Sequence, residues 1–363
     1  MEKYKLDKLP FKTDVETKQV LRKLSVARAA LAELKGVSAT VPNVGILLNT
    51  LALQEAKDSS AVENIITTHD ELFRAELNMQ LVKNVAAKEV QYYALALKKG
   101  FEFVKENKII TNSLILSIHK QLEQNDAGYR VIPGTDLKND KTNEVVYTPP
   151  QDANKIKELM YNLIEFINDD TLQEIDPLLK MAIIHHQFES IHPFYDGNGR
   201  LGRIINILYL VSKDLLDYPI LYLSRYIIQN KGEYYRLLQH VRDANHWENW
   251  LLFILDAVES VSNQSIELIK NIKKVMQEYK FVIRADFPKF YNQDLLNNLF
   301  KHPYTKIDFL QNDLSIIRQT ASKYLNEIAN HPKELLTKVK VGRDYYFINN
   351  GLMSLFSEYD YKL

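Results

Sequence analysis

The sequence predicts a mainly α-helical protein that carries two short β-hairpins. Glycine and proline are few, at 11 each in 363 residues. Long segments repeat apolar residues at the three-to-four spacing of an amphipathic helix. Runs of β-branched residues around a polar turn, which are typical of hairpins, stand out in two places. The predicted helices cover residues 20–34, 72–98, 112–123, 154–167, 177–191, 198–212 and 247–279.

The composition excludes several classes of function. Lys plus Arg and Asp plus Glu both number 46, so the chain has no overall field that would draw it to nucleic acid or an anionic membrane. The absence of cysteine excludes disulfide scaffolds, thiolate metal sites and cysteine nucleophiles, and it fits a reducing compartment. No run of about 18 apolar residues is present, and the polar N-terminal residues do not resemble a signal peptide. We therefore expect a cytoplasmic protein without a membrane segment.

The two predicted hairpins divide the chain. The first lies within residues 128–150, where Val131-Ile132 and Val145-Val146 flank a turn rich in Asn and Asp. The second, within residues 335–348, follows two short helical patterns at residues 306–311 and 315–330. A helix–turn–helix followed by a hairpin predicts a winged helix. The expected domains are an N-terminal helical region (1–108), a central region that contains the first hairpin (109–280) and a winged-helix-like domain (281–363).

The segment that carries chemistry runs from His192 to Arg203 and reads HPFYDGNGRLGR. Pro193 disfavours helix at the residue before it, and an apolar helical pattern resumes near Asn198. The glycines between these helices let backbone N–H groups at a helix N-terminus approach an anion closely. Arg200 and Arg203 share one helical face and add two cations. These features predict a site for nucleotide phosphates.

Two further side chains suggest the reaction at this site. Asp196 would repel a polyphosphate unless a cation lay between them, which favours a Mg²⁺ ligand. His192 has an ordinary pKa near 6.5, which suits a general base at neutral pH. A base, a metal carboxylate, a glycine loop and two arginines together predict phosphoryl or nucleotidyl transfer.

This segment resembles the motif H-P-F-x-D/E-G-N-G/K-R-x-x-R of the Fic family and fills every specified position. The resemblance implies the helical Fic core and transfer of AMP from ATP to a Ser, Thr or Tyr hydroxyl of a target protein or of the chain itself. It makes His192 the base and Asp196 the Mg²⁺ ligand, and it has Phe194 anchor the loop. Gly199 favours AMP transfer over the phosphorylation seen in relatives with Lys there. Nucleotide binding is implied for Gly197, Asn198, Gly199, Arg200, Leu201, Gly202 and Arg203.

Residues 59–64, SSAVEN, resemble the inhibitory motif S/T-x-x-x-E-G/N of many Fic proteins. The resemblance implies that Ser59 and Glu63 belong to an N-terminal inhibitory helix. Glu63 would pair with Arg203 and occupy the guanidinium that the ATP γ-phosphate needs, so that ATP would bind in a non-productive pose. In relatives of this class the same glutamate can position a water that removes AMP, so an AMP hydrolase remains an alternative.

Two further roles are implied by the resemblance, which covers residues 9–255. The hairpin within residues 128–150 corresponds to the flap, an element that pairs with the backbone of the target segment. Residues 234–238, YYRLL, resemble the region that contacts adenine, with Tyr234 favoured over Tyr235, although Tyr234 could equally be a packing aromatic. Relatives with this layout often form homodimers.

Other functions compete with this interpretation. Glu189-x-x-His192 is half of a di-iron helix-bundle motif, but the second half is missing, so His185 and His186 fit structural roles better. The same site could transfer another nucleotide, such as UMP. A rival from another class is a DNA-binding regulator with a nucleotide-sensing core. Residues 284–343 hold ten basic and six acidic residues, which is a modest charge for DNA binding. The candidate DNA contacts are Arg318, Gln319, Lys323, Lys338, Lys340 and Arg343.

Overall fold

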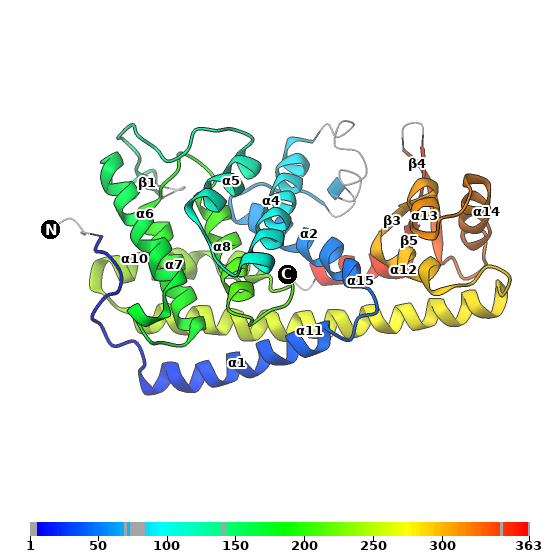
Figure 1. Cartoon of the computed structure of the whole chain (residues 1–363), viewed down its shortest axis with the longest axis horizontal. Coiled ribbons are helices and arrows are strands. Elements are labelled where there is room, and N and C mark those ends of the chain that lie inside the picture. Colours follow the sequence, from blue (N-terminus) through cyan, green and yellow to red (C-terminus); the bar gives the residue numbers. More distant parts are fainter. Residues whose placement is uncertain (1–5, 69–70, 73–83, 140–141, 342–343, 362–363) are drawn as a thin grey trace. The chain divides into compact units, whose positions relative to one another are not determined.

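The computed structural model of the chain describes residues 6–68, 71–72, 84–139, 142–341 and 344–361. Their helices are α1 (Lys18–Ser38), α2 (Val44–Val62), α4 (Val85–Asn107), α5 (Asn112–Glu123), α6 (Ala153–Asn168), the 3₁₀ turn η1 (Asp170–Leu172), α7 (Pro177–Ile191), α8 (Asn198–Ser212), α9 (Leu223–Gln229), α10 (Lys231–Ala244), α11 (Trp247–Asp286), α12 (Gln293–Lys301), α13 (Ile307–Leu314), α14 (Arg318–Ala329) and α15 (Asn350–Tyr361). The strands are β1 (Leu137–Lys138), β2 (Val145–Tyr147), β3 (Tyr304–Lys306), β4 (Leu336–Val341) and β5 (Asp344–Asn349) (Figure 1).

The predicted fold class is confirmed: the protein is mainly helical and carries small antiparallel sheets. The backbone contacts group the chain into two compact units. Unit 1 comprises residues 1–35, 55–66 and 89–263, and unit 2 comprises residues 36–54, 67–88 and 264–363. The domain boundaries predicted from the sequence, after residues 108 and 280, stay a prediction.

The core of unit 1 is built around α7 and α8, which pack closely against each other. Nearly every side chain of both helices is buried. A helix that is buried all round needs neighbours on every side, and α6 packs on α7 while α5 packs on α8. Trp250 of α11 is fully buried and donates from Nε1 to the carbonyl oxygen of Ala182 in α7 (2.9 Å). The connection between α7 and α8 therefore starts and ends on rigid elements.

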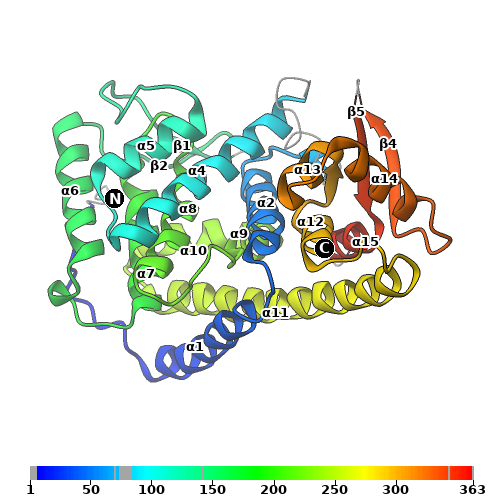
Figure 2. The same cartoon turned by 45° about the vertical axis from the view of Figure 1, so that its right-hand side comes forward.

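Unit 2 contains a three-stranded antiparallel sheet with the strand order β3-β5-β4. Strand β5 lies in the centre, with Thr305 opposite Phe347 on one side and Lys338 opposite Phe347 on the other. Helix α14 packs against β4 (Figure 2). The helix pair α13–α14 and the hairpin β4–β5 match the two helical patterns and the hairpin predicted from the sequence.

Other helix predictions were less accurate. The sequence predicts a helix over residues 72–98, whereas α4 begins at Val85 and continues to Asn107, and residues 73–83 lie outside the described part. The helical patterns did not indicate α2, α9, α10, α12 or α15, and only the resemblance of residues 59–64 to an inhibitory helix pointed to the end of α2. Arg343, a candidate DNA contact, also lies outside the described residues. Among the described helices, none combines the length and the apolar character that crossing a membrane would require.

Candidate active site

The bend between α7 and α8 is set by local sequence. Asp176 accepts a hydrogen bond from the backbone N–H of Leu178 (2.8 Å), and Pro177 occupies the first helical position, as the sequence predicts. At the other end, His192 caps α7 in a left-handed conformation with φ 48°. Gly197, with φ 76°, precedes α8. A Cβ at Gly197 would collide with Glu123, so this position needs glycine for both its backbone angle and its space.

The loop is held in shape by Phe194 and Asn198. The ring of Phe194 is fully buried and stacks on His119 with ring centroids 3.7 Å apart. The side-chain amide of Asn198 accepts from the N–H of Phe194 and donates to its carbonyl oxygen, both at 2.9 Å. His119 Nε2 lies 3.1 Å from the carbonyl oxygen of Asp196. The side chain of Asn198 therefore braces the loop rather than facing a ligand.

The N-terminus of α8 offers backbone N–H groups that can bind an anion. The first helical hydrogen bond runs from the N–H of Leu201 to the carbonyl oxygen of Gly197 (2.9 Å). The N–H groups of Asn198, Gly199 and Arg200 come before it and belong to the donors that a helix cannot satisfy internally. Gly199 lets the Glu63 carboxylate lie close to this helix end, because a Cβ there would collide with it.

Arg203 is held by the segment that carries the inhibitory motif. Its Nε donates to Ser59 Oγ (2.8 Å), and its Nη2 donates to the Ser59 carbonyl oxygen (2.9 Å) and to Glu63 Oε1 (2.8 Å). The side chain of Arg203 is 1% exposed and that of Glu63 is 34% exposed. Burial opposes the charge on Arg203, but the neighbouring Glu63 raises its pKa overall. The ion pair that the motif implies is present.

Arg200 has a different environment from Arg203. Its guanidinium forms ion pairs with Glu89 of α4 (3.2 Å) and Glu123 of α5 (2.9 Å), and its side chain is 5% exposed. Helical spacing predicts both arginines on one face of α8, beside the same anion, but these two carboxylates engage Arg200. Its guanidinium is therefore directed to α4 and α5 rather than to the site around Arg203.

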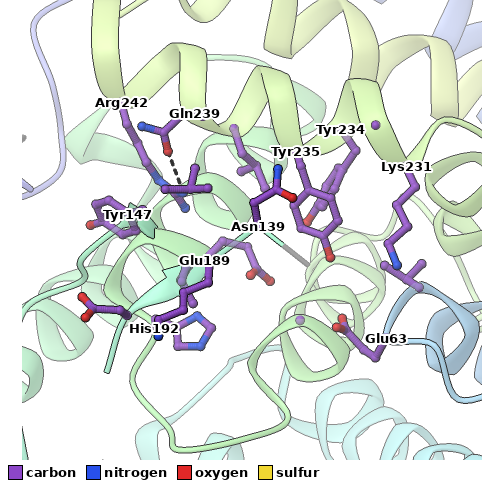
Figure 3. Close-up of a pocket in the computed structure, with 18 of the residues that line it drawn as sticks. Glu63, Asn139, Tyr147, Glu189, His192, Lys231, Tyr234, Tyr235, Gln239 and Arg242 are labelled. Atoms are coloured by element: carbon purple, nitrogen blue, oxygen red, sulfur yellow. Dashed lines mark hydrogen bonds between the residues drawn. The ribbon is translucent and has the colours of Figure 1, made fainter. Parts of the chain in front are cut away.

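A pocket of about 1080 Å³ lies in unit 1 at this helix end. Five of the site residues predicted from the sequence line it: Glu63, His192, Gly199, Arg203 and Tyr234. Figure 3 labels Glu63, His192 and Tyr234 among them. The flap contributes residues 136–139 and 146–147. The other sequence-predicted residues are not among the lining residues: Ser59, Asp196, Gly197, Asn198, Arg200, Leu201 and Gly202.

The ionisation of the pocket favours a neutral base. Burial, together with the nearby Arg130 and Arg242, lowers the pKa of His192 to about 4. The imidazole is therefore uncharged at neutral pH and ready to accept a proton. Burial raises the pKa of Glu189 to about 7. Glu189 is 8% exposed, and its Oε1 has no hydrogen-bond partner among the residues that the structure describes.

The aromatic wall of the pocket consists of two adjacent tyrosines on α10. Tyr234 is 1% exposed, and its hydroxyl lies 2.8 Å from His185 Nε2. Tyr235 is 44% exposed, and Figure 3 shows it facing the pocket together with Lys231. Lys231 donates to Oδ1 of Asn64 (3.0 Å), the last residue of the inhibitory motif.

Sequence reasoning missed several lining residues. Tyr235 lies in the segment 234–238 that resembles the adenine-contact region, but the resemblance favours its neighbour Tyr234. Lys231 carries no signal of its own, because an exposed residue on an amphipathic helix is the ordinary case. Gln239 and Arg242, further along α10, also line the pocket. Glu189 was considered only as half of a metal motif, although its position one turn before His192 places both at the same end of α7. That spacing could have identified it.

The side chains at the site fit a metal only in a limited way. Within the described ranges, no group of three or more His, Asp or Glu residues could hold an ion by itself. Asp196 is exposed and accepts from the N–H of Gly197 (2.6 Å) at the start of α8. One exposed carboxylate beside a phosphate site fits Mg²⁺ bound together with a nucleotide, because this ion uses one or two carboxylates and substrate phosphates.

Comparisons with known proteins assign the family. Three family models match in order: "Fic/DOC family N-terminal" over residues 21–102, "Fic/DOC family" over residues 109–210, and "Protein adenylyltransferase SoFic-like, C-terminal domain" over residues 275–352. The chain therefore belongs to the Fic family.

Its curated relatives are similar over part of their length. A probable protein adenylyltransferase of Aquifex aeolicus is 29% identical over 184 residues, which are 50% of this chain and 54% of that protein. Protein adenylyltransferase fic-1 of Caenorhabditis elegans is 26% identical over 121 residues, which are 33% of this chain and 22% of that protein. The chain thus spans about half of the first relative and about a fifth of the second.

Solved structures show the same fold. A Fic family protein from Desulfovibrio desulfuricans superposes with a TM-score of 0.59 at 18% identity, covering 94% of this chain and 98% of that one. A Fic domain signaling protein from Bacteroides thetaiotaomicron gives 0.54 at 16% identity, covering 69% of this chain and 95% of that one. At these identities the likeness concerns the fold alone.

Proposed function

We propose that this protein is an adenylyltransferase that moves AMP from ATP to a Ser, Thr or Tyr hydroxyl of protein targets and of itself. The observation that carries the proposal is one pocket in which a neutral His192, the N-terminus of α8 at Gly199 and the buried Arg203 meet. The names of the Aquifex and Caenorhabditis relatives support the same reaction.

Each group in the pocket has a task in this reaction. The N–H groups of α8 and the Arg203 guanidinium bind the phosphates and hold negative charge that develops in the transition state. The His192 imidazole takes the proton of the acceptor hydroxyl. The hydroxyl oxygen forms a bond to the α-phosphorus of ATP, and the bond from that phosphorus to the bridging oxygen breaks. Pyrophosphate leaves with the electron pair of the broken bond.

Asp196 would hold the Mg²⁺ that accompanies the nucleotide. When bound, the ion neutralises charge on the phosphate oxygens. The chain contributes the exposed carboxylate and its hydrogen bond from Gly197, which fixes the orientation of one carboxylate oxygen.

Glu63 restrains the enzyme in this proposal. Its carboxylate occupies Arg203 and lies over Gly199, where a Cβ would collide with it. A phosphate at the same place would have to displace the carboxylate or accept a negative charge beside it. Lys231, bound to Asn64, holds the residue next to Glu63. When ATP arrives, the Arg203 guanidinium that would bind its phosphates is therefore already paired with Glu63.

The flap and the tyrosines of α10 would hold the two substrates. The flap residues 136–139 and 146–147 line the pocket and would align the acceptor segment by backbone pairing. Tyr235, whose ring is exposed, would offer an apolar surface to the nucleobase, and the buried Tyr234, whose hydroxyl is bound to His185, supports that ring edge to face, with ring centroids 5.1 Å apart.

Several expectations from the sequence stay proposals of the same kind. They are the winged-helix character of the C-terminal elements, a homodimer and a cytoplasmic location. On α14, Arg318 and Lys323 form ion pairs with Asp308 and Glu327. Their charges are partly neutralised, which disfavours DNA binding. A DNA-binding role for these elements would show as DNA affinity that falls steeply with added salt.

A labelling experiment tests the proposed function. The Glu63→Gly protein is incubated with Mg²⁺ and ATP that carries ³²P at either the α- or the γ-phosphate. We expect protein-bound label from the α-position only, and no label when His192 is also changed to Ala. Label from the γ-position would make the protein a kinase, and transfer only from UTP would change the donor. Release of AMP from a pre-labelled chain would indicate the hydrolase.

A further inference from the structure

Both ends of the flap are tied to the segment that ends α7 and begins the motif loop. On the first side, the N–H of Arg130 donates to the carbonyl oxygen of Pro193 (2.9 Å), and its Nε donates to that of His192 (2.8 Å). On the second side, Arg130 Nη2 donates to the carbonyl oxygen of Pro150, and the hydroxyl of Tyr147 donates to that of Ser190 (2.8 Å). These hydrogen bonds fix the position of the flap relative to the residues around His192.

Tyr195 adds a contact of a different kind. Its hydroxyl oxygen accepts from the N–H of Val131 (2.9 Å) and from the N–H of Ile132 (3.0 Å). These two bonds lower the pKa of the phenol. One oxygen atom on the motif loop thus holds two successive peptide groups at the start of the flap.

This contact is not part of the folded core. The side chains of Tyr195, Val131 and Ile132 are 47%, 60% and 66% exposed. The position of Tyr195 is also the unspecified third residue after His192 in the motif, so the Fic motif itself does not explain the tyrosine. Arg130, by contrast, is 1% exposed and makes bonds on which the local fold depends.

We propose that Tyr195 is a positioning residue that clamps the start of the flap onto the catalytic loop and so sets the distance between the acceptor segment and His192. The predicted effect of this clamp on activity rests on the proposed transferase function. The existence of the clamp depends only on the two hydrogen bonds to Tyr195. A flap that pairs with an extended acceptor can slip or tilt unless its backbone is fixed. A misplacement of about 1 Å at a reacting centre is enough to slow a reaction by orders of magnitude.

The variant Tyr195→Phe tests the clamp with minimal disturbance, because it removes one oxygen atom from an exposed ring. It is made in the Glu63→Gly background, so that the enzyme is not restrained. Tyr161→Phe is the matched control, since Tyr161 is an exposed tyrosine (60%) on α6. Hydrogen–deuterium exchange is followed in peptides that cover residues 129–136. We expect exchange of the two bound amides to accelerate about fivefold or more in Tyr195→Phe only.

Activity is measured on the same proteins with a saturable acceptor, the His192→Ala chain, which cannot label itself. We expect Tyr195→Phe to lower kcat/KM for this acceptor about fivefold or more while KM for ATP stays within about twofold. Unchanged exchange would overturn the clamp. Faster exchange with an unchanged acceptor kcat/KM would overturn its role in positioning. If the Glu63→Gly parent transfers no AMP, the proposed function fails, and the exchange experiment still decides whether the clamp exists.

Discussion

Removing the Glu63 carboxylate tests whether this residue inhibits the transferase. In the structure this carboxylate lies 2.8 Å from Arg203 Nη2 and above Gly199, so a bound triphosphate must displace it. A hydrogen bond between charged partners contributes about 1.5–3 kcal/mol. Because the Glu63 side chain is a third exposed, solvent weakens the pair, and its contribution falls to about 1–2 kcal/mol.

The energy of the Glu63–Arg203 pair sets the expected gain in ATP affinity when the carboxylate is removed. At about 1.4 kcal/mol for each factor of ten, ATP should bind Glu63→Gly about 5- to 30-fold more tightly than the wild type. Glu63→Gln keeps the size of the side chain and loses its charge, so it should fall between the two. Glu63 follows the last residue of α2, Val62, so glycine there does not interrupt the helix.

The assay is isothermal titration with ATP and Mg²⁺, performed in the His192→Ala background so that no turnover occurs. AMP incorporation by the Glu63→Gly protein with intact His192 should rise by at least the same factor at low ATP. Equal ATP affinity in all three Glu63 forms, together with unchanged incorporation, would refute the inhibitory role. Tighter binding without greater incorporation would mean that Glu63 also has a task in the transfer step.

The remaining predictions concern the base, the buried carboxyl and the loop brace. His192→Ala should abolish AMP incorporation and leave the ATP dissociation constant within about twofold, because the base acts only in the transfer step. At saturating ATP, the rate of the wild type should hold from neutral pH down to about 5 and fall as His192 is protonated near its pKa of about 4. Burial raises the pKa of Glu189 to about 7, so above that pH this residue carries a negative charge beside the bound phosphates. The affinity for ATP, measured by titration, should therefore weaken by about 3- to 10-fold between pH 6 and 8. Glu189→Gln should remove this pH dependence. Asn198→Ala loses both bonds to Phe194 and should lower the free energy of unfolding by about 1–3 kcal/mol in denaturant titrations; a change below about 0.5 kcal/mol would contradict the brace.

The bend that forms the site could be predicted because its determinants are local. Asp176 with Pro177, then Pro193, fix where α7 begins and ends, and these effects act within a few residues. The flap hairpin was predicted only in part: its second strand, β2, lies at the predicted apolar run, but the first strand, β1, is Leu137–Lys138 rather than the run at Val131-Ile132. The N–H groups of Val131 and Ile132 bond instead to the hydroxyl of Tyr195, a contact that the strand pattern does not reveal.

The environment of each charged side chain could not be predicted in the same way. Helical spacing places Arg200 and Arg203 on one face, but their partners lie more than 70 residues away in the chain, on α4 and α5 for Arg200 and around residues 59–63 for Arg203. The depressed pKa of His192 also follows from burial and from distant cations, Arg130 and Arg242. The Glu63–Arg203 pair is the exception, because the resemblance of residues 59–64 to the inhibitory motif predicted it.

The helices that sequence reasoning missed also depend on tertiary context. Helix α2 is apolar at many positions that do not follow one stripe, and the side chains of its residues 50–56 are almost all buried. Its residue Glu55 is buried too, where Tyr93 donates to its carboxylate (3.0 Å) and burial raises its pKa to about 8. From sequence alone, a charged residue at such a position is expected to face solvent.

The most direct test of the central claim is mass spectrometry of the intact Glu63→Gly protein after incubation with ATP and Mg²⁺, followed by peptide mapping. The account predicts a mass increase of one AMP group, located on a Ser, Thr or Tyr hydroxyl and absent from the Glu63→Gly, His192→Ala double variant. An increase of one phosphate group, or no adduct with ATP bound at full occupancy, would contradict it.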